Sequence, residues 1–112
     1  MLLSVVPVIP VTRIEHAAEV LNRVGFTENW VHVPGATPLR YASYVNKDAG
    51  LELHVSESRG DGTGPVVTYF WVDDIDALAA QAGELAANQT WGTREFWLRD
   101  QDGNTYRFGQ RL

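Results

Sequence analysis

Cysteine is absent from this 112-residue sequence, so disulfides, thiolate metal sites and cysteine nucleophiles are excluded. No run of about 18 apolar residues occurs, which excludes a membrane-spanning helix. The first residues lead directly into a strand pattern without a basic stretch or a cleavage site, so we expect no signal peptide. The length corresponds to one domain. We therefore expect a cytoplasmic protein with no membrane partner.

Basic residues are fewer than acidic ones, at 9 against 14, and the formal net charge is −5. This balance argues against a nucleic-acid partner, because binding to phosphates selects a basic face. It mildly favours a cationic ligand through long-range steering. Many soluble proteins are equally acidic, so the charge alone has little weight.

The first half of the sequence predicts one helix and four strands. Apolar residues 3–11 indicate a strand that Pro7 and Pro10 confine to a sheet edge, because proline cannot donate to a ladder. Thr12 with Glu15 three residues later predicts a capping box at a helix start, and Gly25 ends that helix. Three further strands are expected at residues 26–33, 39–45 and 51–56, with a turn at Pro34-Gly35 between the first two.

The second half of the sequence repeats a similar order of elements. Residues 58–65 are rich in glycine and predict a loop without a regular element, and we regard the Arg59-Gly60-Asp61 tripeptide in it as chance composition. A strand over residues 66–72 is followed by a helix that begins at Asp73-Asp74, where carboxylates complement the helix dipole. A short strand is expected near residues 85–87.

Residues 91–110 predict a hairpin that turns at Asp102-Gly103, where glycine supplies the positive φ of a tight turn. Asp100-x-Asp102-x-Asn104 is similar to the start of a calcium loop, but Arg111 stands where such a loop needs a bidentate glutamate, so we interpret it as a turn. Side chains alternate between the two faces of each strand. The apolar face of the hairpin carries Phe96, Leu98, Tyr106 and Phe108, and the other face carries Glu95, Trp97, Arg99, Thr105 and Arg107.

The hairpin sequence Trp91-Gly-Thr-Arg-Glu-Phe, followed by Asp-x-Asp-Gly-Asn, resembles the C-terminal signature of the glyoxalase and bleomycin-resistance proteins, the vicinal oxygen chelate superfamily. It is most similar to the antibiotic-binding branch. The resemblance implies an α+β fold in which paired βαβββ modules form a curved mixed sheet around a cleft, with helices on the outer face. The single domain 1–112 would comprise module one at about 1–57, a loop at 58–65 and module two at about 66–112.

Strand alternation and the resemblance together predict a ligand site on the concave face of the sheet. Flat aromatic rings with a few charges are typical of a small-molecule site. The alternative is that these rings are buried in a homodimer interface or in a closed core. The candidate ligand-binding residues are Trp30, Glu52, His54, Tyr69, Trp71, Trp91, Glu95, Trp97 and Arg107, of which Trp30 and Trp91 come from the resemblance.

We expect neither a metal nor another cofactor. The resemblance places the superfamily's metal-ligand positions near Val6, Glu52, Val67 and Arg107, and only the glutamate is a ligand type. A catalytic zinc or iron site needs about three protein ligands. The remaining histidines, His16 and His32, are interpreted as solvated or hydrogen-bonded.

The resemblance implies a homodimer in which two subunits form the clefts between them and commonly exchange their N-terminal strands. The favoured function is metal-free binding: sequestration of a planar aromatic or cationic compound, as in antibiotic resistance proteins. The alternative is a lyase, isomerase or dioxygenase, either metal-dependent or using Glu52 or Glu95 as a base. No catalytic residue is assigned.

Overall fold

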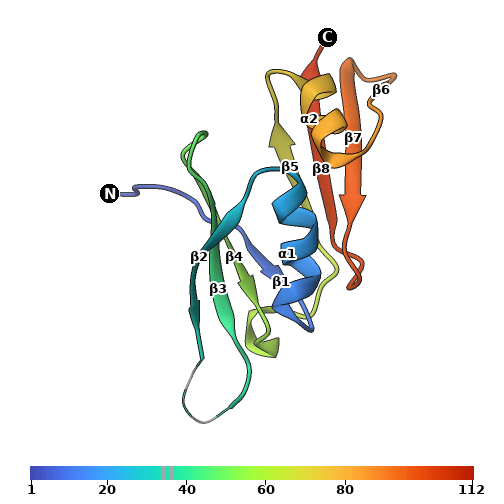
Figure 1. The fold of residues 1–112 in the computed structure, drawn as a ribbon. Helices are drawn as coiled ribbons and strands as arrows, with labels where there is room; N and C mark the ends of the chain where they lie inside the picture. Colours follow the sequence, from blue (N-terminus) through green and yellow to red (C-terminus); the bar gives the residue numbers. More distant parts are fainter. Residues whose placement is uncertain (34, 36) are drawn as a thin grey trace.

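The computed structural model describes residues 1–33, 35 and 37–112, so the turn expected at Pro34-Gly35 lies partly outside the described residues. Two helices and eight strands follow one another along the chain (Figure 1). In order they are β1 (Val8–Pro10), α1 (Ile14–Arg23), β2 (Thr27–His32), β3 (Tyr41–Asn46), β4 (Leu51–Ser56), β5 (Val67–Trp71), α2 (Ile75–Ala82), β6 (Ala87–Asn88), β7 (Thr93–Arg99) and β8 (Thr105–Arg111).

The strands form two four-stranded mixed sheets with the same internal order. Sheet one runs β1-β4-β3-β2 and sheet two runs β5-β8-β7-β6. In each sheet the first strand is parallel to its neighbour, and the remaining pairs are antiparallel. The α+β fold of paired modules is confirmed. No helix in the described part of the chain is long and apolar enough to cross a membrane.

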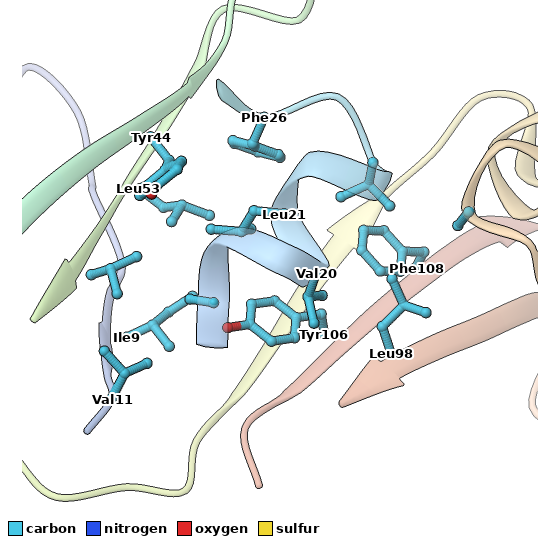
Figure 2. Packing of buried hydrophobic residues seen from close by; sticks show 14 of the residues in the cluster. Ile9, Val11, Val20, Leu21, Phe26, Tyr44, Leu53, Leu98, Tyr106 and Phe108 are labelled. Carbon is cyan, nitrogen blue, oxygen red and sulfur yellow. The ribbon is translucent and has the colours of Figure 1, made fainter. Parts of the chain in front are cut away.

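One hydrophobic core joins the two sheets, and α1 lies between them (Figure 1). Leu21 of this helix packs toward Phe26 and Leu53 of module one, whereas Val20 packs toward Tyr106 of module two (Figure 2). The predicted apolar face of the C-terminal hairpin is confirmed, because Phe96, Leu98, Tyr106 and Phe108 are all buried in this core. Sheet one packs its apolar face on α1, and sheet two packs its apolar face on α2, so both polar faces point away from the shared core.

The first strand is shorter than predicted. Only Val8–Pro10 pair with β4, at the edge of sheet one. The prediction of a strand over residues 3–11 was wrong at its start. The Pro7 carbonyl still accepts the His54 N–H at 2.9 Å, but proline has no N–H to continue the ladder. The side chains of Leu2, Leu3 and Val5 are consequently exposed.

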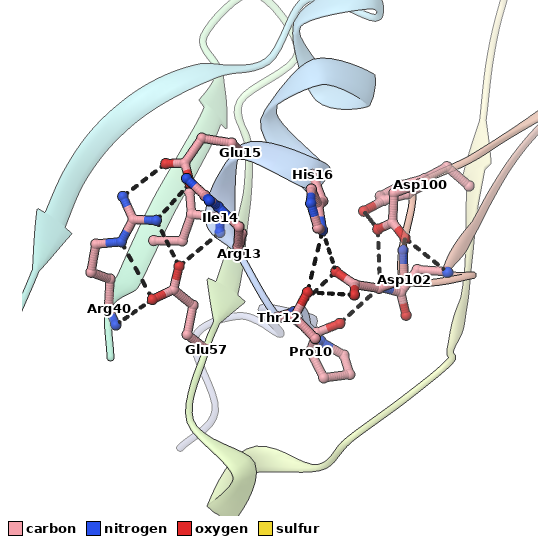
Figure 3. A network of polar contacts seen from close by, with 12 residues as sticks. Pro10, Thr12, Arg13, Ile14, Glu15, His16, Arg40, Glu57, Asp100 and Asp102 are labelled. Atoms are coloured by element: carbon pink, nitrogen blue, oxygen red, sulfur yellow. Dashed lines mark hydrogen bonds and ion pairs between the residues drawn. The ribbon is translucent and has the colours of Figure 1, made fainter. Parts of the chain in front are cut away.

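The predicted capping box of α1 is also wrong. Arg13 occupies the N-cap and its side chain makes no capping bond. The Ile14 N–H instead donates to the buried Glu57 carboxylate at 2.9 Å, and Glu57 also pairs with Arg40 at 2.8 Å (Figure 3). Thr12 donates to Asp102 at 2.7 Å. The carboxylates of Glu57 and Asp102, which are distant in sequence, thus take the place of the predicted Thr12–Glu15 capping box.

Smaller elements differ from the expectations in detail. The helix start predicted at Asp73-Asp74 is confirmed, and the Asp74 side chain also caps α2 by accepting the Ala77 N–H at 3.2 Å. The glycine-rich loop contains a single 3-10 turn at Arg59–Asp61, where no regular element was expected. The short strand β6 is Ala87–Asn88 instead of residues 85–87. It pairs only with Arg94 and Glu95 of β7.

Asn104, at the end of the hairpin turn, connects the modules through buried hydrogen bonds. Its side-chain amide donates to the Pro10 carbonyl at 2.8 Å and to Asp100 at 2.9 Å. Its side-chain oxygen accepts the Val66 N–H at 2.9 Å. The residue is 1% exposed, so water cannot replace these partners.

We expect Asn104→Ala to lower the free energy of unfolding by roughly 2–4 kcal/mol, because it leaves the Pro10 carbonyl and the Val66 N–H without partners. Urea denaturation monitored by circular dichroism measures the change. The control is Asn22→Ala, at an exposed position of α1, which should change stability by less than about 0.5 kcal/mol. Equal effects of the two variants would contradict a connecting role for Asn104.

Candidate functional site: two polar sheet faces

The predicted site residues fall into two groups on the polar faces of the two sheets. Trp30, Glu52 and His54 belong to sheet one. The other six gather on sheet two and the turn before β7: Tyr69, Trp71, Trp91, Glu95, Trp97 and Arg107. Because the apolar faces share one core, the two polar faces lie on opposite sides of it. A cavity of about 550 Å3 between residues 4–7, β4 and β5 is lined by Glu52 of the first group and by Tyr69 and Trp71 of the second.

On sheet one a chain of hydrogen bonds links four side chains. The Tyr41 hydroxyl lies 2.9 Å from His54 Nδ1, and His54 Nε2 lies 3.1 Å from Glu52. Ser43 donates to the same Glu52 oxygen at 2.6 Å. The Trp30 ring stacks on Tyr41, with 6.1 Å between centroids. Hydrogen bonds from Ser43 and His54 lower the pKa of Glu52, so the carboxylate is ionised at neutral pH.

Tyr41 and Ser43 were not among the predicted site residues. Both lie on β3, where register pairs Tyr41 with Ser56 and Ser43 with His54. Alternation had placed them on one face of β3, but only the register shows which residues of β4 they meet.

On sheet two, Glu95 is a buried acceptor that organises the surrounding aromatic side chains. It is 6% exposed. Its Oε1 accepts from Arg107 at 2.7 Å. Its Oε2 accepts from three donors, at 2.5, 2.8 and 3.2 Å respectively: the Tyr69 hydroxyl, the Thr93 hydroxyl and the Trp91 indole N–H.

These hydrogen bonds determine the protonation states in the cluster. Burial alone would raise the pKa of Glu95, but the donors, with Tyr69 and Arg107 foremost, outweigh burial and lower the pKa to about 2. Burial and the Glu95 carboxylate raise the pKa of Tyr69, so its phenol stays a protonated donor. The cluster is therefore fixed as an ionised carboxylate with four donors at neutral pH.

Gly109 of β8 makes the contact between Tyr69 and Glu95 sterically feasible. A Cβ at this position would lie 1.8 Å from the Tyr69 hydroxyl oxygen and 2.7 Å from the ring carbon that carries it. The Tyr69 side chain thus crosses β8 over the glycine to reach β7. The sequence did not reveal this role, because it depends on which strands are neighbours.

Arginine side chains lie over the aromatic rings of the same face. The guanidinium carbon of Arg107 is 5.4 Å from the Tyr69 ring centroid and 5.9 Å from that of Trp91. Arg111, which was not predicted as a site residue, lies 4.0 Å above Trp71. The Trp71, Trp91 and Trp97 side chains remain 55–61% exposed. A cavity of about 530 Å3 is lined by Tyr69, Trp71, Trp91, Thr93, Glu95 and Arg107.

The donor set does not fit the metal site that the sequence resemblance implies. Val67 has no ligand atom and pairs with Thr105 in the sheet register, and Arg107 pairs with Glu95, so neither position offers a ligand. Across residues 1–33, 35 and 37–112, no group of three or more His, Cys, Asp or Glu side chains gathers where a metal could bind. We therefore derive no chemistry through a metal.

Solved structures with the same fold include antibiotic-binding proteins and enzymes. A bleomycin-binding protein complexed with bleomycin matches with a TM-score of 0.70 and 18% identity, over 97% of this chain and 98% of that one. A glyoxalase-related enzyme from Clostridium phytofermentans matches at 0.76 and 17%, over 100% and 97%. A fosfomycin resistance protein from Listeria monocytogenes matches at 0.64 and 11%, over 100% and 96%.

The resemblance seen in residues 91–110 is thus confirmed at the level of the fold over nearly the whole chain. No family model matches the sequence. No curated protein matches it either.

We expect Glu95→Gln to lower the free energy of unfolding at neutral pH by roughly 1–3 kcal/mol, because the amide leaves Arg107 without a charged partner and one buried donor unpaired. A carboxylate with a lowered folded-state pKa stabilises the fold above its ordinary pKa of 4.5, and this contribution is lost as the pH falls toward about 2. The difference between wild type and variant should therefore shrink between pH 5 and pH 2.

Urea denaturation across this pH range measures the difference. Glu19→Gln, at an exposed position of α1, is the matched control and should follow wild type at every pH. A constant difference between Glu95→Gln and wild type from pH 6 to pH 2 would contradict the assignment.

Proposed function

We propose that this chain is a metal-free binding protein that sequesters a planar aromatic or cationic compound in a cleft at a dimer interface. The observation that carries the proposal is the gathering of exposed Trp71, Trp91 and Trp97 around a buried, fully bonded Glu95 on one sheet face. Glu95 holds the Trp91 indole directly, and Trp71 and Trp97 lie on the same sheet face, an arrangement suited to stacking on a flat ligand. A neighbour with the same fold is a bleomycin-binding protein, which supports this class of function.

A second copy would complete the cleft. Within one chain each polar face can form only one wall of a cleft, because the shared core separates the two faces. The polar face of sheet one carries its own stacked pair, Trp30 and Tyr41. Two-fold association would place the polar face of sheet one opposite the polar face of sheet two of the partner. It would also cover exposed apolar surface.

An enzyme is the second candidate, favoured by the hydrogen-bond chain Tyr41–His54–Glu52. A carboxylate that orients a histidine is a recurrent general-base arrangement. The fold also occurs in a glyoxalase-related enzyme. Under this alternative, Glu52→Gln would abolish turnover of a bound compound; under the binding proposal, no compound that binds is chemically changed by the wild type.

We expect a homodimer at micromolar concentration. Multi-angle light scattering measures the mass directly, and the expected value is twice the 12.5 kDa of one chain. Burial of the exposed tryptophans should also shift their fluorescence to the blue as the concentration rises. A stable monomer throughout would contradict the shared cleft.

We expect planar aromatic compounds, screened with both charge signs and with bleomycin included, to quench tryptophan fluorescence and raise the melting temperature. Trp71→Ala and Trp97→Ala should each weaken binding of a compound so identified by roughly 1–3 kcal/mol, through lost stacking and lost apolar burial. Calorimetry measures the affinities. Leu39→Ala, which removes an exposed apolar side chain elsewhere, should have no effect. Unchanged affinity in both tryptophan variants would exclude the aromatic face as the binding site.

A further inference from the structure

The polar face of sheet two has a local charge opposite to that of the whole chain. The chain has a formal net charge of −5. On this face, however, β7 and β8 carry Arg99, Arg107 and Arg111 against the Glu95 carboxylate, and Asp73 follows the end of β5. Salt screens the charges of the rest of the chain beyond about 10 Å, whereas the charges that line a site lie within this distance of a bound ligand. The local charge therefore decides which ligands this face accepts.

Glu95 cannot serve as the partner of a ligand cation. Both of its oxygens already accept hydrogen bonds from protein donors, and Arg107 neutralises its charge at 2.7 Å. The guanidinium of Arg107 also lies over the Tyr69 and Trp91 rings. A cationic ligand would thus meet rings whose negative faces already attract a positive charge.

Arg111 lies beside the aromatic cavity, over its lining residue Trp71, and its charge remains available. Among the described residues it forms no ion pair within 4.0 Å, unlike Arg107. Its register partner on β7 is Thr93, which lines the aromatic cavity. Asp73 shares a smaller hollow with Arg111 and Trp71. The Arg111 guanidinium lies over the Trp71 ring and can bind a carboxylate through two parallel hydrogen bonds.

We infer that the aromatic cavity of sheet two binds a planar aromatic anion, with the ring beside Trp71 and Trp91 and the anionic group on Arg111. This inference rests on the proposed binding function and specifies its ligand class. It replaces the preference for a cation that the net charge had suggested for this face. Arg99, which lies 4.9 Å from the Trp97 ring centroid, extends the positive character along the same face.

Three flat compounds of nearly identical shape test the inference: 2-naphthoate, 2-naphthamide and 2-naphthamidine, which are anionic, neutral and cationic. Calorimetry and tryptophan quenching on the full chain measure their affinities. We expect the naphthoate to bind about tenfold more tightly than the naphthamidine at low salt, as for a charge-assisted hydrogen bond at a partly exposed site. Raising the salt concentration should reduce this preference.

The variants Arg111→Gln and Arg59→Gln remove one positive charge each, the second from an exposed loop far along the chain. We expect Arg111→Gln to weaken naphthoate binding about tenfold and to leave naphthamide binding within twofold. Arg59→Gln should change neither. Circular dichroism and melting temperature establish that both variants fold.

Three other outcomes would contradict, respectively, the preference for an anion, the role of Arg111, or the aromatic binding site itself. Equal binding of the three compounds, or tighter binding of the naphthamidine, overturns the anion assignment and leaves the proposed binding function standing. If Arg111→Gln still prefers naphthoate as strongly as wild type does, Arg111 does not bind the anionic group and the inference is wrong. If none of the three compounds binds at millimolar concentration, both the inference and the aromatic binding site fall.

Discussion

The joining of both modules in one core is the constraint on which the rest of this structure depends. Because α1 packs on sheet one, α2 packs on sheet two and their apolar side chains meet in one cluster, the chain closes a single core from two small modules. A shared core suits a chain of 112 residues, because each module alone would have little interior. The same arrangement turns both polar faces outward, so each face is open to a partner or a ligand.

The sheet-two face is ordered by polar contacts more than by apolar ones. Glu95 lies on the strand between β6 and β8, and its four donors come from β5, β8 and the segment that begins β7. Because Gly109 has no side chain, it leaves room for the Tyr69 side chain to reach Glu95. A buried carboxylate that is fully hydrogen-bonded fixes the orientation of each donor, because any donor that moved would leave a buried charge partly unpaired. The exposed rings therefore stand on a rigid base.

Local patterns predicted much of this molecule. Alternation identified β4 over its full length, Leu51–Ser56, and assigned both faces of the C-terminal hairpin. These successes share a cause, since the side-chain period of a strand depends only on its own backbone. The helix start at Asp73-Asp74 was predicted for the same reason, because the residues that stabilise it are adjacent to it in sequence.

Features that depend on distant partners were missed. The start of α1 is satisfied by Glu57, 43 residues away, instead of by the local Thr12 and Glu15. The position of Arg111 over Trp71 requires β5 and β8 to be neighbours, which no local pattern reveals. The two sets of site residues were expected on one concave face, but the shared core separates them. This separation depends on how the two modules pack, which no local pattern reveals.

The link between the hairpin turn and the first helix has a consequence for synthesis on the ribosome. Pro10 and Thr12 obtain their side-chain partners from Asn104 and Asp102, which lie 94 and 90 residues further along the chain. The N-terminal module therefore emerges with these groups still facing water, and they are satisfied only when the last hairpin leaves the exit tunnel. Contacts of such long sequence separation slow folding. The two modules should thus acquire their final packing together, once the last hairpin has emerged, and not one after the other.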